Sequence, residues 1–191
     1  MKIVNMKTLN ETQLTQAAQM LTDELPLGWP TLADAEQEVN GLLNLGACGA
    51  PDCFWRYDGE SAFLAAAEGE QVIGWGGLLP SYGRVFELHP LVVRRDWQGK
   101  GAGTMLVSAL EDVARKQGAL TLWLGADDEN TPPETSFANV DLYDDLPRRI
   151  QEFDPGTHQT AFYMKLGFKI VGVMPDATGP GRPDIYMAKR L

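Results

Sequence analysis

The stretch Leu91-Val-Val-Arg-Arg-Asp-Trp-Gln-Gly-Lys-Gly-Ala-Gly-Thr-Met-Leu106 decides the fold of this chain. Its apolar start is typical of a buried strand, and residues 103–117 repeat apolar side chains at helical spacing. Between them lie Gly99, Gly101 and Gly103, which let backbone N–H groups turn toward one point. A helix start behind such a loop adds unpaired N–H groups and partial positive charge. The stretch therefore predicts a strand, a loop and a helix that together form a cradle for an anion such as pyrophosphate.

The glycine loop matches neither of two common phosphate-binding motifs. It lacks the Gly-Lys-Ser/Thr ending of a P-loop, and its Gly-x-Gly-x-Gly spacing differs from the dinucleotide fingerprint. A tight strand–helix turn without a ligand is the alternative interpretation.

The rest of the chain predicts a single α/β domain over residues 1–191. Asn10 with Gln13 forms a capping box for the first helix, which Pro26 ends, and Thr31 caps a second helix that stops at Gly46. Further helices are expected over 103–117, 141–151 and 157–166, the last capped by Thr157. Strands are expected over 3–9, 62–68, 72–79, 85–93, 120–125, 168–174 and 184–189, with a Gly/Pro loop over 175–183. This order predicts a central mixed, mostly antiparallel sheet with helices on both faces.

The segment Phe86-Glu-Leu-His-Pro-Leu-Val-Val93 carries two titratable side chains on one strand. Alternation places Glu87 and His89 side by side on the same face. Pro90 cannot donate to a sheet ladder, so pairing should break there and the sheet should splay. A splayed gap beside the glycine loop could admit a slender ligand arm. The alternative is that Glu87 and His89 only pair with each other at a sheet edge.

Negative charge is concentrated in one segment. The chain has a formal net charge of −10, and residues 127–155 contain nine acids and two arginines. Such a field repels nucleic acid and anionic membranes, so we expect neither of these as a partner. The same field attracts cations. The alternative is a solvated acidic face that only keeps the protein in solution. Since the N-terminus has no apolar signal core, we expect a cytoplasmic location.

The two cysteines, Cys48 and Cys53, lie in a predicted loop over 47–60. A structural zinc site needs four ligands, and the two histidines of the chain are not at finger spacing. We therefore interpret the cysteines as reduced loop thiols and expect no metal site.

Two segments together resemble the GNAT superfamily of acetyltransferases. Gln98-x-x-Gly101-x-Gly103 resembles the superfamily's coenzyme A pyrophosphate loop, and Phe162-Tyr-x-Lys-Leu-Gly-Phe168 resembles a motif near the end of many of its members. From residue 82 onward the chain is most similar to aminoglycoside 6′-N-acetyltransferases. The segments that carry this resemblance are Glu87–Val93, Leu124–Asp128, Asp141–Tyr143, Phe162–Val173 and Pro183–Lys189. It fades before residue 82, and the loop over 47–60 looks like an insertion.

The resemblance implies an enzyme, with a role for each candidate residue. Glu87 would accept the amine proton, directly or through water, with His89 nearby, and the Leu91 N–H would polarise the thioester carbonyl. Tyr163, which periodicity alone would make a core residue, would protonate the thiolate. Acetyl-CoA, as co-substrate, would contact Leu91, Val92, Val93, Gln98, Gly99, Lys100, Gly101, Ala102, Gly103 and Thr104. The acceptor would contact Asp127, Asp128, Asp141 and Tyr143.

The implied reaction moves an acetyl group from acetyl-CoA to a primary amine of a small cation, such as the 6′-amino group of an aminoglycoside. Other acceptors that stay open are a polyamine, another amino-sugar and a peptide amine. A non-catalytic sensor of acyl-CoA is the alternative from a different class. The resemblance and the apolar C-terminal strand Ile185–Ala188 also predict a homodimer.

Overall fold

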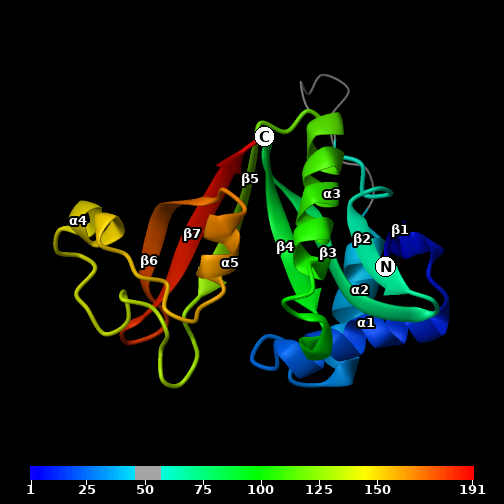
Figure 1. The fold of residues 1–191 in the computed structure, drawn as a ribbon, viewed down its shortest axis with the longest axis horizontal. Helices are drawn as coiled ribbons and strands as arrows, with labels where there is room; N and C mark the ends of the chain where they lie inside the picture. The colour runs from blue at the N-terminus through cyan, green and yellow to red at the C-terminus, as the bar shows by residue number, and fades with distance from the viewer. Residues whose placement is uncertain (46–56) are drawn as a thin grey trace. The chain divides into compact units, whose positions relative to one another are not determined.

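A computed structural model describes residues 1–45 and 57–191 of the chain (Figure 1). It divides into two compact units, residues 1–122 together with Leu191, and residues 123–190. The first unit contains β1 (Lys2–Asn5), η1 (Met6–Thr8), α1 (Glu11–Glu24), α2 (Leu32–Leu43), β2 (Phe63–Glu68), β3 (Gln71–Tyr82), β4 (Val85–Val93), η2 (Arg95–Trp97) and α3 (Ala102–Lys116). Then follow β5 (Thr121–Asp127), α4 (Leu146–Gln151), α5 (Thr160–Lys165), β6 (Lys169–Gly179) and β7 (Arg182–Arg190). The α/β class and the mostly antiparallel pairing are as predicted.

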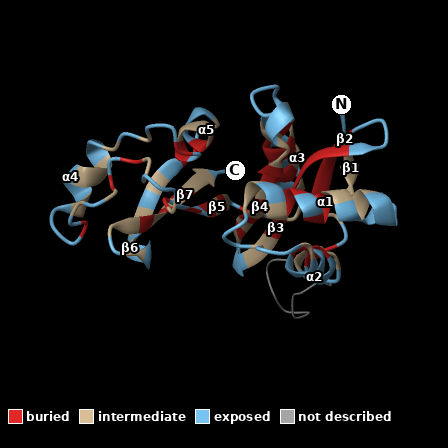
Figure 2. Ribbon diagram, turned by 90° about the horizontal axis from the view of Figure 1, so that it is seen from below, coloured by how far each residue is buried: buried red, intermediate tan, exposed pale blue. Residues whose placement is uncertain are grey.

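The first unit is an antiparallel sheet in the order β1-β2-β3-β4, with helices on both faces. The alternation of β3 assigns the faces. A Cβ on Gly76 would lie 3.3 Å from Leu110 of α3 and 2.9 Å from the Pro90 carbonyl oxygen, so only glycine lets α3 and β4 approach this closely. Trp75 points the other way, and its indole N–H donates to the Ala17 carbonyl of α1 at 2.9 Å. The sheet therefore lies between α3 on one side and α1 on the other (Figure 2).

Both predicted caps of the N-terminal helices are confirmed. The Asn10 side chain accepts from the Gln13 N–H, and the Gln13 side chain accepts from the Asn10 N–H. Thr31 caps α2 by accepting from the Asp34 N–H at 3.2 Å. These caps fix where α1 and α2 begin, and so which of their side chains face β4.

The pairing of β3 with β4 is irregular at the predicted place. Gly76 pairs with Leu91 while Leu78 pairs with Leu88, so β4 has one more residue than β3 in this interval. The extra residue falls at 89–90, where Pro90 has no N–H to donate. The expected break in pairing is confirmed on this side of β4, whereas the splay stays a prediction.

In the second unit the strand order is β5-β7-β6. Its core contains Leu124, Tyr163, Phe168, Ile185 and Met187, all buried. The C-terminal strand β7 lies between β5 and β6 and is not an edge, which corrects the argument used above for dimerisation. The outer strand of this unit is β6, on which Val171 and Met174 are exposed. The homodimer itself stays a prediction.

Several boundaries differ from the predicted ones. The first strand ends at Asn5, because the Asn5 side chain accepts from the Lys7 N–H and starts the 3₁₀ turn η1. The helix predicted over 141–151 is confined to α4, since the Asp141 carboxylate bonds to the Tyr143 N–H and Asp145 has a positive φ of 50°. Such a local side-chain bond competes with the helix.

The C-terminal boundaries also shift. The helix predicted over 157–166 begins only at Thr160, and Thr157 does not cap it. The predicted Gly/Pro loop over 175–183 is mostly strand, because β6 continues to Gly179 and pairs there with Arg182. The Gly/Pro content of this segment predicted a loop, but pairing between β6 and β7 makes most of it strand.

Cys48 and Cys53, which we interpreted as reduced loop thiols, lie outside the residues that the structure describes. In the described part of the chain, no helix has both the length and the apolar character to cross a bilayer.

Candidate active site

The glycine loop joins β4 to α3 in the geometry expected of an anion cradle. Gly99 and Gly101 have φ values of 71° and 87°, which non-glycine residues rarely adopt, whereas Gly103 has no positive φ and belongs to the first turn of α3. A Cβ on Gly101 would meet no atom within 4 Å, so the space in front of it is open. The Met105 N–H bonds to the Gly101 carbonyl at 3.0 Å, and the N–H groups at the very start of α3 precede this bond.

The side chains of the loop are held by local contacts. The Gln98 amide donates to the Val93 carbonyl at 2.9 Å, which closes the turn after β4. The ammonium of Lys100 lies 5.3 Å from the centre of the Trp97 ring, in a cation–π contact. Backbone N–H groups, the exposed ammonium of Lys100 and an open face suit a pyrophosphate, so this donor set fits the coenzyme predicted for it.

Glu87 and His89 share one face of β4, as predicted. Burial alternates along the strand, with Glu87, His89, Leu91 and Val93 half-buried on one face, while Val92 on the other face is buried. Only the backbone of Val92 is thus available for the coenzyme contact predicted at that residue.

His89 has partners that the sequence did not suggest. Its Nε2 lies 3.7 Å from a carboxylate oxygen of Glu38 on α2, and its ring centre lies 6.1 Å from that of Trp29. The alternative that His89 only pairs with Glu87 is therefore not what the structure shows. No local sequence pattern identifies Glu38 or Trp29 as a neighbour of His89. The path of the chain through α1, the following connection and α2 brings both residues to β4.

Tyr163 is buried in the second unit, on α5. Its ring packs edge-on against Phe168 and Phe162, with centres 5.7 and 5.1 Å away. Burial raises the pKa of Tyr163 well above its usual value, so its hydroxyl stays protonated throughout the physiological range. The residue thus has a proton to donate, and it is also part of the core.

Four residues were predicted to contact the acceptor substrate, and among them Asp128 has a different environment from the others. It is fully buried, and its carboxylate accepts from the Glu134 N–H at 2.9 Å and from the N–H and hydroxyl of Thr135 at 2.8 and 2.7 Å. Burial raises its pKa, but these hydrogen bonds outweigh burial and lower it. The hydrogen bonds of the Asp128 carboxylate fix the loop over 128–135. This internal role argues against the predicted contact between Asp128 and the acceptor substrate.

Asp127 remains exposed and has an acidic neighbour. Desolvation raises its pKa, and desolvation together with the negative charge of Asp127 raises the pKa of Glu129. A bound cation would relieve this repulsion. The backbone around Asp127 is fixed by buried His158, whose Nε2 lies 2.9 Å from the Asp127 carbonyl oxygen. His158 carries no sequence signal for this role.

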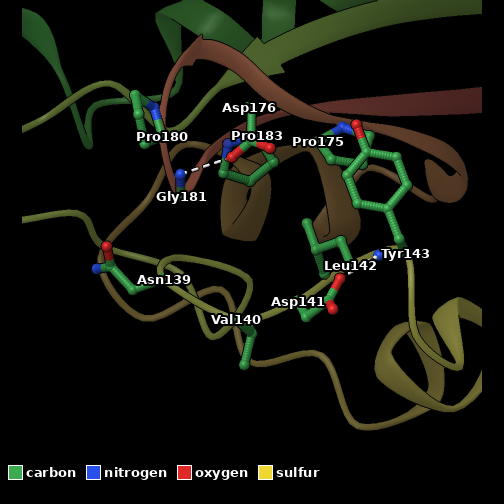
Figure 3. Close-up of a pocket in the computed structure, with 10 residues that line it drawn as sticks. All are labelled: Asn139, Val140, Asp141, Leu142, Tyr143, Pro175, Asp176, Pro180, Gly181 and Pro183. Atoms are coloured by element: carbon green, nitrogen blue, oxygen red, sulfur yellow. Dashed lines mark hydrogen bonds between the residues drawn. The ribbon is translucent and has the colours of Figure 1, made fainter.

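Asp141 and Tyr143 line a pocket of about 380 Å³ in the second unit (Figure 3). The Asp141 carboxylate accepts from the Tyr143 N–H at 2.9 Å, and the Tyr143 side chain is 78% exposed. Across the pocket, Asp176 accepts from the Gly181 N–H at 2.7 Å and holds the turn between β6 and β7. The structure thus brings Asp141 and Tyr143 together, while Asp127 and Asp128 do not line this pocket.

The fold and the loop define a protein class that binds a coenzyme through a strand–turn–helix cradle. The model of the acetyltransferase (GNAT) family matches residues 15–134, well over half of the 191 residues. The chain belongs to this family, and it is an acetyl-CoA-dependent N-acetyltransferase.

Individual similar proteins match most or all of the chain. An aminoglycoside 6′-N-acetyltransferase solved in complex with coenzyme A is 31% identical, with 100% of this chain and 97% of that chain covered and a TM-score of 0.83. The aminoglycoside 6′-N-acetyltransferase from Enterococcus faecium is 30% identical, with the same coverage and TM-score. An uncharacterized N-acetyltransferase of Mycobacterium tuberculosis is 24% identical over 179 residues, with 94% of this chain and 97% of the relative covered.

The cradle predicts the effect of a charged side chain at Gly101. Gly101→Asp should abolish acetyl-CoA binding in calorimetry, because the carboxylate fills the open space and repels the pyrophosphate. Gly118→Asp is the matched control, since Gly118 at the other end of α3 has a φ of 83° and also meets nothing within 4 Å. Unchanged affinity in Gly101→Asp, or equal loss in both variants, would remove the cradle assignment.

The buried carboxylate predicts a pH-dependent stability difference. Asp128→Asn should destabilise the fold at neutral pH, because it turns an acceptor of three hydrogen bonds into a side chain with only one acceptor atom. Since the folded pKa is lowered, the contribution of Asp128 is present above the unfolded pKa of about 3.9 and is lost as pH falls further. Urea unfolding is measured from pH 7 to pH 3. The difference in unfolding free energy between wild type and Asp128→Asn should become smaller toward pH 3. Asp144→Asn, a change at an exposed residue, is the control. Equal stability of wild type and Asp128→Asn at pH 7 would contradict the structural role of Asp128.

Proposed function

We propose that this N-acetyltransferase acts on a primary amine of a small polycation, with the 6′-amino group of an aminoglycoside as the first acceptor to test. The observation that carries the proposal is the full-length similarity to aminoglycoside 6′-N-acetyltransferases at 30–31% identity. The side chains Glu87, His89 and Tyr163 support catalysis over acyl-CoA sensing, because a sensor needs only the cradle.

The distribution of carboxylates supports a polycationic acceptor. Within the acidic segment, Asp128 is used internally and Glu152 pairs with Arg148 at 2.9 Å. The exposed carboxylates of Asp127 and Asp141 remain available to ammonium groups. Each exposed pairing contributes only about 0.2–1 kcal/mol, so recognition would rest on several weak contacts.

The chemistry assigns one task to each residue. Acetyl-CoA supplies the activated acetyl thioester. Glu87, with His89 beside it on β4, takes a proton from the acceptor's ammonium group so that a neutral amine attacks the carbonyl carbon. The Leu91 N–H polarises the carbonyl oxygen. As the new C–N bond forms and the C–S bond breaks, Tyr163 donates its proton to the departing thiolate. The second proton that the nitrogen loses on becoming an amide passes through solvent and restores the Tyr163 hydroxyl.

Tyr163→Phe tests the proton-donor role. The variant should lower kcat by about 10²–10⁴-fold while acetyl-CoA affinity and melting temperature stay near wild type, because phenylalanine keeps the ring packing. Tyr57→Phe is the matched control: the Tyr57 hydroxyl donates to the Leu78 carbonyl at 2.8 Å inside the core, so its loss should lower the melting temperature and leave kcat unchanged. If Tyr163→Phe behaves like Tyr57→Phe, then Tyr163 is structural.

An acceptor panel with a thiol-release readout tests the substrate class. Kanamycin-type sugars should be acetylated, and kcat/KM should fall steeply with added salt as exposed charge pairs are screened. Asp127→Asn should raise KM for the sugar more than KM for a monoamine, while KM for acetyl-CoA stays constant.

The control is Asp112→Asn, which removes an exposed carboxylate on α3 that pairs with Arg115. Thiol release with a peptide or monoamine but with no aminoglycoside would refute the acceptor assignment and leave acetyl transfer in place.

A further inference from the structure

The last residue of α1, Glu24, holds the loop that follows β4. One carboxylate oxygen accepts from the Arg95 N–H at 2.9 Å, and the other accepts from the Gln98 side-chain amide at 3.4 Å. The second oxygen also lies 3.7 Å from Nε of Arg95. The Glu24 side chain is only 12% exposed, while that of Arg95 is 84% exposed. Glu24 thus contacts residues 71 and 74 positions away in sequence.

The charge of Glu24 is unexpected at this place. A carboxylate beside a loop assigned to pyrophosphate would repel that ligand, and an ion pair with the exposed Arg95 side chain contributes little, so charge alone is a weak reason for it. Its hydrogen bonds give a stronger one. The Gln98 amide is shared between Glu24 and the Val93 carbonyl, which fixes it between α1 and the end of β4. Gln98 directly precedes Gly99, the first residue of the turn with positive φ.

We propose that Glu24 is a positioning residue for coenzyme A: it holds residues 95–98 so that the N–H groups of the following turn keep a common direction. The inference rests on the assignment of the cradle to coenzyme A. The proposed role requires no contact between Glu24 and the ligand. Its contribution depends on the reach of its side chain and not on its charge, and these two properties can be separated.

Two conservative variants separate reach from charge. Glu24→Asp keeps the charge but withdraws the carboxylate by one methylene, so it should weaken coenzyme A binding by roughly fivefold to tenfold, the effect of losing one or two hydrogen bonds. Glu24→Gln keeps the length and one oxygen that accepts from the Arg95 N–H, and it loses only the longer 3.4 Å contact with Gln98 and the charge opposite the exposed Arg95 side chain. Its affinity should therefore fall by no more than about threefold. An electrostatic role predicts the opposite order, with Glu24→Asp unchanged and Glu24→Gln binding more tightly.

The experiment is calorimetry of coenzyme A with wild type, Glu24→Asp, Glu24→Gln and the control Asp23→Glu, a one-methylene change at an exposed neighbour on α1. In parallel, kcat/KM is measured with acetyl-CoA and with S-acetylpantetheine, which lacks the pyrophosphate. The loss in Glu24→Asp should appear with acetyl-CoA and be absent with the truncated thioester, which a general loss of structure would not produce.

The outcomes distinguish this inference from the function on which it rests. Wild type that fails to bind coenzyme A refutes the cradle. Wild type that binds, with Glu24→Asp binding equally well or losing activity equally on both thioesters, overturns the positioning role of Glu24 alone.

Discussion

The turn between β4 and α3 is the constraint on which the rest of this molecule depends. Positive φ at Gly99 and Gly101 turns the chain from the end of β4 into the start of α3 within a few residues. Any other residue at these positions would strain the backbone, and a longer connection would move the helix start away from the strand end. The donors for an anion exist because this turn is both short and open.

The close approach of α3 to the sheet depends on a second set of glycines. Gly74 and Gly76 on β3 leave room for Leu106 and Leu110, while Trp75 between them points to α1 and bonds to its backbone. One strand thus fixes a helix on each face. Because Glu24 at the end of α1 bonds to the loop after β4, the helices on the two faces are connected through the cradle itself. The half-buried face of β4, with Glu87 and His89, lies in the same unit.

The acidic segment has two different roles that its composition does not distinguish. Asp128 is buried, accepts three hydrogen bonds and fixes a loop. Asp127 next to it is exposed, and its charge adds to desolvation in raising the pKa of Glu129. Adjacent residues on a strand end point to opposite sides, so one carboxylate becomes structural and the other stays available to a ligand. A net charge describes only their sum and does not distinguish a buried carboxylate from an exposed one.

The sequence by itself determined the elements whose signals are local. The caps at Asn10 and Thr31, the limits of β4, the glycine turn and the shared face of Glu87 and His89 follow from patterns over a few residues, because backbone geometry and alternation act at that range. The tertiary structure decided the rest. It extended β6 through a Gly/Pro segment by pairing it with β7, shortened the helices at α4 and α5, and buried Asp128. It also brought Glu38 to His89 and Glu24 to Gln98, across long separations in sequence. Such contacts arise from packing between distant segments, and no local preference of the residues involved encodes them.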